Sequence, residues 1–412
     1  MPSKDIPLPR LGIDILSEET SLPAGAVRKA VNIDLGRTGV SQVRDGYRRV
    51  IPSTQLHSLY AIKRSIGLLA IDGLTISYVN PTTFAVSALG QLNSAHPADF
   101  TEYNGSIYVV NRTSFMVFPQ TSNIPVQCGL DKPQTPVLSA GAGPLLPGTY
   151  SVAVTTVSAS GEESPASDVV QIKLTEVGGI SVSSLPLGPG KTRVYASAID
   201  GEVLYRAEEF LSVIDTALVS EKPDGAKLTT QHLSRFPGGD MVRAHNGRLY
   251  VANGSDLLFS EPLRPHLYSP RHGVIPFTGG IKFIEAVLGG VFVGDSRGVW
   301  FLEGDDPSTA RLKYVTSCRA VARSSVMVPG EHFDPKTIDS ELPVALWLST
   351  SGYTVGLPDG STKELHPDRI KVPTGLTGRS VFYIRNGRKQ VLTPVNSSST
   401  SVAEAAIDSV IP

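Results

Sequence analysis

The sequence predicts an all-β fold: a β-propeller of about six blades with one inserted fibronectin type III-like β-sandwich. Three observations lead to this prediction. Short runs of alternating apolar and polar residues, bounded by Gly, Asn, Asp and Pro, recur along the chain, and this is the signal of β-strands. A two-strand pattern repeats six times at a nearly constant interval. The interval is broken once, by a surplus large enough for a separate module.

The first predicted element is a β-hairpin near the N-terminus. In residues 30–35, Val31, Ile33 and Leu35 alternate with polar residues, and a return strand follows at 40–50. Alternate residues of a strand point to the same side, so these three apolar side chains should share one buried face. We therefore expect the hairpin to support the propeller by pairing with blade strands near the C-terminus.

The repeat consists of a turn, an apolar strand, a second turn and another strand. Its six copies begin at Gly67, Asn104, Asn246, Gly289, Val344 and Ser380. Most copies lie roughly 40 residues apart, with one gap nearer about 55, which is close to the period of four-stranded propeller blades. The alternative is that these are unrelated strands of one large sandwich or jelly roll.

The exceptional gap, between the second and third copies, is about 140 residues long, and subtracting one blade leaves about 100, the size of a β-sandwich. Within it, Tyr150, Val152 and Val154 alternate with small or polar residues, and further strand patterns follow. The Cys…Trp…Cys pattern of immunoglobulin domains is missing, so the fibronectin type fits better.

The predicted organisation has five parts. They are an N-terminal arm and hairpin (1–56), the first part of the propeller (57–131), the inserted sandwich (132–230), the second part of the propeller (231–395) and a C-terminal tail (396–412). The tail begins with a Ser/Thr-rich run and is expected to be extended. Only residues 18–22 and 401–410 have a pattern that would allow short helices.

Composition narrows the class of protein. The 412 residues include 37 basic and 38 acidic ones, so no global positive charge draws the chain to nucleic acid. Cys128 and Cys318 allow one disulfide bond at most. The N-terminus lacks the apolar core of a signal peptide, and the most apolar stretches are short and contain Asp72 or Glu285. We therefore expect synthesis in the cytoplasm and no stable membrane insertion.

Motifs for catalysis or cofactor binding are weak. Residues 188–192 end like a phosphate-binding loop, but Leu185 stands where the first glycine is needed. The acidic run at 303–306 lacks the alternating oxygen ligands of a calcium loop. No His and Cys have zinc spacing, and no nucleophile-elbow pattern occurs. The prediction is a non-enzymatic protein without metal or cofactor.

Basic residues cluster once, in the N-terminal hairpin. Arg44, Arg48 and Arg49 surround Tyr47, and two more cations stand upstream at positions 28 and 29. Such a cluster suits contact with nucleic acid or with an acidic protein face. Alternatively, the charges only keep a solvated strand edge from pairing. We take Arg44, Tyr47, Arg48 and Arg49 as candidate protein-contact residues.

The segment 22–50 resembles the opening of virion proteins from tailed bacteriophages, in which a short N-x-D-L…G…R-x-G-Y hairpin precedes blade-like repeats. The matching positions are Asn32, Asp34, Leu35, Gly39, Arg44, Gly46 and Tyr47. The family that the chain resembles is the tail nozzle of short-tailed phages, also called tail tubular protein B.

This resemblance implies a homo-oligomeric ring, a hexamer, in the virion tail below the head-to-tail adaptor protein. Such a ring continues the DNA channel, closes it before infection and carries tail fibre or spike proteins. DNA would pass through the lumen without sequence-specific binding, and a balanced charge suits this role because a basic lumen would hold DNA. The hairpin residues Arg44, Arg48 and Arg49 are then candidates for the contact with the adaptor.

Two other functions remain open. A receptor- or glycan-binding protein of the tail tip would use aromatic residues on blade loops, for which Tyr268, Trp300 and Tyr353 are candidates. A propeller hydrolase would instead need carboxylates that converge on the central channel.

Overall fold

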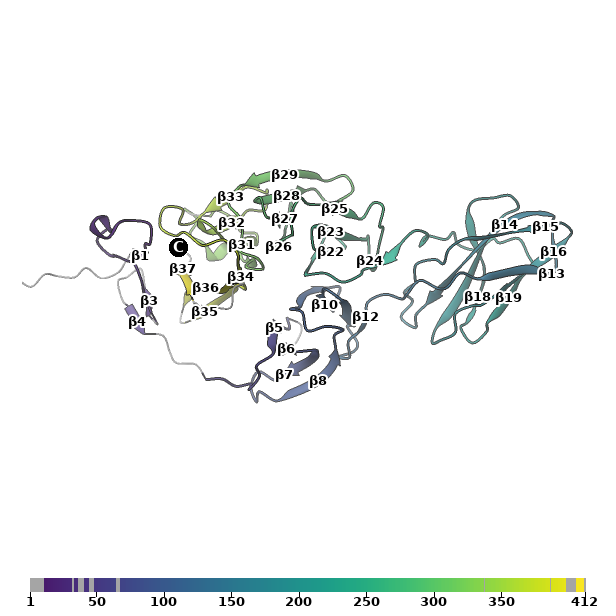
Figure 1. The fold of residues 1–412 in the computed structure, drawn as a ribbon, viewed down its shortest axis with the longest axis horizontal. Coiled ribbons are helices and arrows are strands. Elements are labelled where there is room, and N and C mark those ends of the chain that lie inside the picture. The colour runs from purple at the N-terminus through teal and green to yellow at the C-terminus, as the bar shows by residue number, and fades with distance from the viewer. Residues whose placement is uncertain are drawn as a thin grey trace, which may run out of the picture.

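The computed structural model describes residues 11–397, apart from 32, 36–40, 44–47, 64–66, 337 and 386, and also residues 405–410. In this part of the chain the regular structure is β-strand, together with two 3-10 turns at Glu19–Ser21 and Gly330–His332. None of the described segments is a helix long and apolar enough to cross a membrane. Figure 1 shows an elongated molecule, in which one group of sheets surrounds a centre and a separate sandwich lies at one end. The all-β prediction is confirmed.

Six successive antiparallel sheets form the propeller, which confirms the predicted architecture. Blade 1 is β5 (Leu56–Ala61), β6 (Leu68–Asp72), β7 (Thr75–Val79) and β8 (Val86–Gln91); blade 2 is β9 (Asp99–Tyr103), β10 (Ser106–Asn111), β11 (Ser114–Phe118) and β12 (Val126–Gln127). Blade 3 is β21 (Met241–His245), β22 (Arg248–Asn253) and β23 (Asp256–Glu261), extended by β20 (Ser234–Arg235), β24 (Arg264–Tyr268) and β25 (Val274–Pro276).

The other three blades follow without interruption. Blade 4 is β26 (Phe283–Val287), β27 (Gly290–Gly294), β28 (Val299–Glu303) and β29 (Arg311–Thr316). Blade 5 is β30 (Val326–Val328), β31 (Val344–Ser349), β32 (Gly352–Gly356) and β33 (Thr362–Glu364); blade 6 is β34 (Leu376–Gly378), β35 (Val381–Arg385), β36 (Arg388–Ser397) and β37 (Ala405–Val410).

The sequence repeat corresponds to one hairpin of each blade. In the first five blades it covers the second and third strands, and in blade 6 it covers β35 and β36. The turns that precede two of these hairpins contain Asn104-Gly105 and Asn246-Gly247, and all four residues have positive φ. Asn-Gly with two left-handed residues is the favoured two-residue turn, because its twist matches that of the flanking strands.

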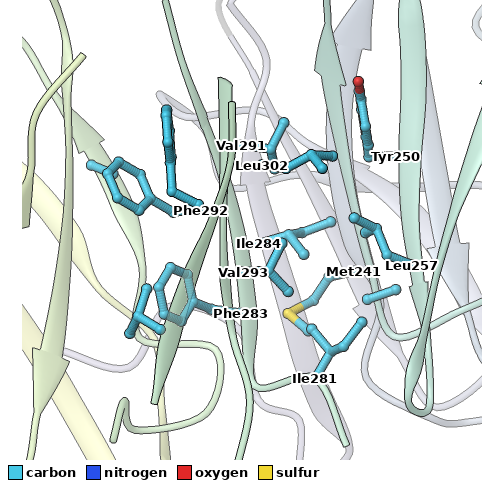
Figure 2. Packing of buried hydrophobic residues seen from close by; sticks show 14 of the residues in the cluster. Met241, Tyr250, Leu257, Ile281, Phe283, Ile284, Val291, Phe292, Val293 and Leu302 are labelled. Carbon is cyan, nitrogen blue, oxygen red and sulfur yellow. The ribbon is translucent and has the colours of Figure 1, made fainter. Parts of the chain in front are cut away.

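The propeller core consists of apolar layers between neighbouring blades. The largest described cluster joins blades 3, 4 and 5 (Figure 2). Phe283 of blade 4 stacks on Trp347 of blade 5, with ring centroids 4.9 Å apart, and the Phe292 ring lies tilted against the same Trp347, with centroids 5.5 Å apart. On the opposite side of the same sheet, Ile284 packs toward Met241 of blade 3. Both faces of a blade are therefore buried, and strands such as β27 are apolar throughout.

The inserted sandwich has two antiparallel sheets over a core of its own. One sheet is β13 (Val137–Leu145), β16 (Gly178–Ser183) and β19 (Thr216–Val219), and the other is β15 (Val170–Leu174), β14 (Gly148–Val157), β17 (Lys191–Ser197) and β18 (Leu204–Leu211). The sandwich enters the chain between β12 and β20, at the outer edges of blades 2 and 3. Asp131 and Arg235, on either side of it, form an ion pair of 2.9 Å, so its two ends are neighbours.

The N-terminal arm contains two short strand pairs. β1 (Gly12–Ile13) runs parallel to β2 (Ala26–Val27), and β3 (Ile33–Leu35) pairs with β4 (Ser41–Val43) as a hairpin. The predicted turn of this hairpin lies outside the described residues. The expectation of a buried apolar face is wrong: Val31 is 66% exposed and Ile33 37% exposed, because no described strand covers them.

Upstream of the hairpin, the arm is attached to the connection between blades 5 and 6. The Ile15 amide donates to the Arg369 carbonyl at 2.9 Å, and the Arg369 guanidinium donates to the Leu11 carbonyl at 2.8 Å. The predicted pairing of the hairpin with a C-terminal blade is wrong, because β3 and β4 form a separate two-stranded sheet, and Leu11 and Ile15 make these contacts instead.

The predicted extended tail at 396–412 needs correction. β36 continues to Ser397, and β37 pairs with it over six positions between Ala405 and Val410. Val395 pairs with Gly378 of β34 on one side and with Ala405 of β37 on the other, so β37 covers the outer edge of blade 6. An uncovered edge would leave a row of unpaired backbone groups, which explains why an Ala/Ile/Val segment is a strand here.

Candidate functional site

The structure describes two of the four predicted contact residues. Arg44 and Tyr47 lie outside the described residues, whereas Arg48 and Arg49 are exposed just after the hairpin. The Arg49 guanidinium donates to the carbonyl oxygens of Ile51, at 3.1 Å, and of Ser53. These bonds hold Arg49 against the segment that leads into blade 1, while Arg48 is presented to solvent.

A buried charge network, which the sequence did not reveal, joins several blades. Asp99 at the start of β9 accepts from Arg243 of β21 at 2.6 Å, and Arg243 also donates to Glu285 of β26 through two nitrogens, at 2.9 and 3.3 Å. Arg379, between β34 and β35, donates to the second oxygen of Asp99 at 2.9 Å and to the Ala98 carbonyl at 2.9 Å. We call these four charged residues, Asp99, Arg243, Glu285 and Arg379, the axial network.

The position of the axial network follows from the topology. β21 lies beside both β9 and β26, so these first strands of blades 2, 3 and 4 are neighbours. Around a ring of six blades, blade 1 lies between blade 6 and blade 2, so the contact between Arg379 and Asp99 joins two blades that are not neighbours. Asp240, just before β21, adds contacts to Arg112 of blade 2 at 3.0 Å and to Arg323 before blade 5 at 3.4 Å.

Electrostatics keep Asp99 and Arg243 charged. Burial alone would raise the pKa of Asp99, but the Arg243 and Arg379 guanidinium groups outweigh burial and hold that pKa well below its usual range. Burial opposes the charge of Arg243 as well, and the Asp99 and Glu285 carboxylates more than offset it and raise the pKa of Arg243. The side chains of Asp99 and Glu285 are almost fully buried. Both carboxylates join neighbouring blades, and Asp99, with its lowered pKa, is poorly suited to proton transfer at neutral pH.

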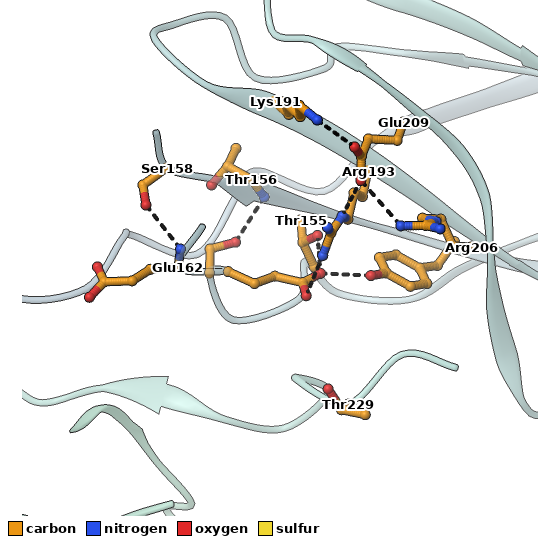
Figure 3. Close-up of polar contacts among 12 residues, drawn as sticks. Thr155, Thr156, Ser158, Glu162, Lys191, Arg193, Arg206, Glu209 and Thr229 are labelled. Atoms are coloured by element: carbon orange, nitrogen blue, oxygen red, sulfur yellow. Dashed lines mark hydrogen bonds and ion pairs between the residues drawn. The ribbon is translucent and has the colours of Figure 1, made fainter. Parts of the chain in front are cut away.

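A second charge network lies on the sandwich (Figure 3). Glu209 of β18 accepts from Lys191 at 2.8 Å and from Arg193 at 2.7 Å, and Arg193 also donates to Glu163 at 2.9 Å. The hydrogen bonds from Lys191 and Arg193 lower the pKa of Glu209 to about 2. Burial, together with its hydrogen bond to Glu163, raises the pKa of Tyr195 to about 12.

This sandwich network continues to the junction with the propeller. The backbone carbonyl of Glu163 lies 3.3 Å from the Nε2 atom of His266, on β24 of blade 3. Next to it, the Arg264 guanidinium donates to the Thr229 hydroxyl at 3.0 Å. The sandwich therefore contacts blade 3 through the same segment that carries Glu163.

The weak motifs in the sequence are turns in the structure. Residues 188–190 lie in the connection between β16 and β17. In the acidic run, Asp306 accepts from the Ser308 amide and hydroxyl and from Arg248, and Asp305 accepts from Asn246. Within the described part of the chain, no three His, Cys, Asp or Glu side chains are grouped closely enough to hold a metal ion.

The aromatic residues proposed for a receptor site belong to blade strands. Tyr353 of β32 is fully buried and donates to the Thr393 hydroxyl at 2.7 Å. Trp300 of β28 packs edge-on against Phe277 and Tyr314. Tyr268, on β24, stacks on Phe236 with centroids 5.0 Å apart. None of these three residues lies on a loop.

The two cysteines are free thiols. Cys128 is buried behind blade 2, and burial raises the pKa of its thiol well above the usual value. A buried thiol with a raised pKa is chemically inert. Cys318 is partly exposed and contacts Glu364 at 2.9 Å.

Comparisons with known proteins found no matching family model and no matching curated protein. Among solved structures, the chain is similar to the N-terminal domain of Nup159, at 9% identity and a TM-score of 0.33, with 84% of this chain and 74% of that one covered. It is also similar to the Neurospora crassa Pan2 WD40 domain, at 8% identity and a TM-score of 0.31, with 87% and 94% covered.

A third similar structure is the extracellular domain of the putative one component system BT4673 from B. thetaiotaomicron, at 11% identity and a TM-score of 0.30. The match covers 82% of this chain and 40% of that chain, so this chain spans less than half of its length. At such identities and scores, these likenesses carry no argument about function.

Proposed function

We propose that the protein is a structural component of the tail of a short-tailed phage, a nozzle subunit that continues and closes the DNA channel below the head-to-tail adaptor. The observation that carries this proposal is the N-terminal hairpin, whose sequence resembles that of nozzle proteins and whose apolar residues Val31, Ile33 and Val43 are exposed. An isolated two-stranded hairpin is marginally stable in water. An exposed apolar hairpin of this kind is suited to contact another subunit.

The axial network supports a conduit built from several copies. Charged side chains from blades 2, 3, 4 and 6 meet at the centre of the propeller, so a DNA duplex has no path through a single subunit. The DNA channel would then run between subunits, with each propeller forming a segment of its wall. Closed rings of this kind arise from heterologous contacts, in which one face of a subunit meets a different face of the next.

The same network supports the proposal that the chain is not an enzyme. A propeller hydrolase needs carboxylates on the central channel, and Asp99 and Glu285 are the carboxylates of the axial network. Arg243 bonds to both of them, however, and the pKa of Asp99 is lowered. A carboxyl group that stays ionised and paired is a poor general acid.

Electron microscopy tests the proposed function. The purified chain is mixed with the adaptor protein of its phage, and intact virions are imaged alongside. We expect a ring of copies, coaxial with the adaptor, that surrounds the DNA channel. Isolated copies at a fibre tip, away from the channel, would overturn the proposal in favour of the receptor- or glycan-binding function.

A further inference from the structure

Two exposed apolar surfaces lie at opposite ends of the molecule. The first, which we call the arm face, consists of Val31, Ile33 and Val43. Ile33 and Val43 are directly opposite each other in the β3–β4 hairpin, so their side chains share one side of it. Val43 is 67% exposed. Figure 1 shows this hairpin at the end of the molecule away from the sandwich.

The second surface, which we call the tip, is formed by three loops of the sandwich. These loops connect β13 to β14, β15 to β16 and β17 to β18, and they carry the exposed side chains of Leu146, Val177, Ile199 and Val203. Leu146 and Val177 are 61% and 62% exposed.

Strand pairing places the three loops at one end of the sandwich. Leu145 pairs with Gly178, and Gly148 pairs with Leu174, so the first two loops are adjacent. The Thr149 amide donates to the Asp200 carboxylate at 2.9 Å, which ties the first loop to the third. The chain enters the sandwich at the other end, where Val137 pairs with Ser183. The tip therefore points away from the propeller.

The charges around the two surfaces are opposite in sign. The tip loops and the segment after β19 carry five exposed carboxylates and fewer exposed cations. The carboxylates are Glu176, Asp200, Glu202, Glu221 and Asp224, and the cations are Lys222 and Lys227, with Lys173 at the end of β15. The chain on either side of the hairpin carries the exposed cations Arg28, Lys29, Arg48 and Arg49. Among the arm residues whose side chains the structure describes, the exposed carboxylates are Glu18 and Glu19, at the N-cap and first position of the preceding 3-10 turn.

We propose that the arm face of one copy docks onto the tip of the next copy, head to tail. Each surface has an apolar centre and a charged rim, and the two rims attract each other, which is the arrangement that protein interfaces use for specificity and rapid association. This inference rests on the proposed nozzle function in one respect: the function requires that the head-to-tail contacts close into a ring. It also assigns Arg48 and Arg49 to the neighbouring subunit and no longer to the adaptor.

Complementing variants of the full chain test the contact. One variant carries Val31→Glu and Val43→Glu on the arm face, and the other carries Leu146→Lys and Val177→Lys on the tip. In sedimentation velocity, the wild type should associate as its concentration rises, and each variant should associate at least about tenfold more weakly, since central apolar contacts dominate interface energy. An equimolar mixture of the two variants should form heterodimers and nothing larger, because it retains one intact contact per pair.

Matched controls separate the contact from general surface effects. Val213→Lys matches the tip variant: it places a positive charge at the other end of the sandwich, on a residue that is 76% exposed. Leu288→Glu matches the arm variant: it places a negative charge in an exposed turn of the propeller. Neither should change association. A third variant, Arg48→Glu with Arg49→Glu, lies outside the strands and should weaken association even if substitution within the hairpin impairs its folding.

Three results would overturn the proposal. The first is a wild type that stays monomeric up to about 1 mM, which is beyond the range of a useful subunit contact. The second is a mixture of the two variants without heterodimers. The third is a control that weakens association as much as the variants do. In a Cys318→Ser background, copies with Val43→Cys mixed with copies with Val177→Cys should form disulfide-linked heterodimers. Heterodimers without a ring on the adaptor would leave this contact standing and count against the nozzle function alone.

Discussion

The Arg379 guanidinium, in the last blade, donates a 2.9 Å hydrogen bond to Oδ1 of Asp99, in the second blade, although 280 positions separate the two residues. The bond joins two blades that are not neighbours in the ring and ties the last blade to the axial network. Asp99 is also the acceptor for Arg243, so it is the residue on which the axial network depends.

Asp99→Asn should therefore destabilise the propeller strongly. The substitution leaves Arg243 and Arg379 without their shared anion, and breaking a buried ion pair from one side costs about 3–5 kcal/mol. Arg379→Gln should cost less, because Arg379 is partly exposed and Arg243 still pairs with Asp99. Urea unfolding of the full chain measures both losses. The exposed pair of Lys132 and Asp168 serves as control, and Lys132→Ala should leave stability unchanged. A wild-type unfolding midpoint for Asp99→Asn would show that the network contributes nothing.

Trp347 should be the most costly aromatic residue to truncate in the propeller core. Its side chain is fully buried between Phe283 and Phe292, and Trp347→Ala should cost about 3–5 kcal/mol, as is usual for large-to-small core changes. Trp347→Phe should cost clearly less, since it keeps a ring and removes an indole N–H that is buried without a partner. Equal losses for the two variants would contradict this account of the layer.

Gly356 should not tolerate a side chain. An added Cβ would lie 2.6 Å from the Phe292 ring and 2.8 Å from the Trp347 ring. Gly356→Ala should therefore destabilise the propeller by about 1–3 kcal/mol, because an overpacked core must shift. Gly375→Ala is the control for the substitution itself, as its Cβ would meet nothing within 4 Å, although its φ of 84° adds some backbone strain. A larger loss at Gly375 than at Gly356, measured by urea unfolding, would refute the packing argument.

Glu209 should make the stability of the sandwich depend on pH. Its pKa falls from an ordinary value of 4.5 to about 2 in the folded state. A lowered folded-state pKa contributes stability that is fully present above pH 4.5 and is lost as the pH falls toward 2. The melting temperature of the wild-type sandwich should thus exceed that of Glu209→Gln near neutral pH, and the two should converge near pH 2. A difference that is constant over this range would exclude the carboxylate as its source.

The sandwich should be removable. Since Asp131 and Arg235 are paired at its base, a short Gly/Ser linker in place of residues 132–230 can join the two ends. We expect a β protein that still unfolds cooperatively, because the sandwich has an apolar core of its own. The loss to the propeller is the contact of the buried His266 with the Glu163 carbonyl and the bond from Arg264 to Thr229. Circular dichroism during thermal unfolding measures this. Insoluble aggregate would contradict the boundaries.

The blades could be predicted because their signal is local. Asn-Gly turns such as Asn104-Gly105 and alternating strands lie within a few residues of each other, and the repeat multiplies the pattern. The axial network could not be predicted, since Asp99, Arg243 and Arg379 come from different blades and no spacing links them. The alternation of Val31 and Ile33 predicts a buried face, but the same pattern occurs where another molecule covers the strand, so it does not show which molecule makes the contact. At the C-terminus, the polar run before β37 suggests an extended tail, and the sequence of β37 alone does not show that it pairs with β36.

The neighbouring ends of the inserted sandwich have a consequence for how this chain could change over time. The sandwich is inserted between the outer edge strands of blades 2 and 3, and its core is separate from the apolar layers of the propeller. A different sandwich, or two in series, can be joined to the chain at the same gap between Asp131 and Arg235, where the contacts to replace are those of Glu163 and Thr229 with blade 3. Exchange of this one domain can therefore change the length of the molecule and its outer contacts, while the six-bladed propeller stays the same.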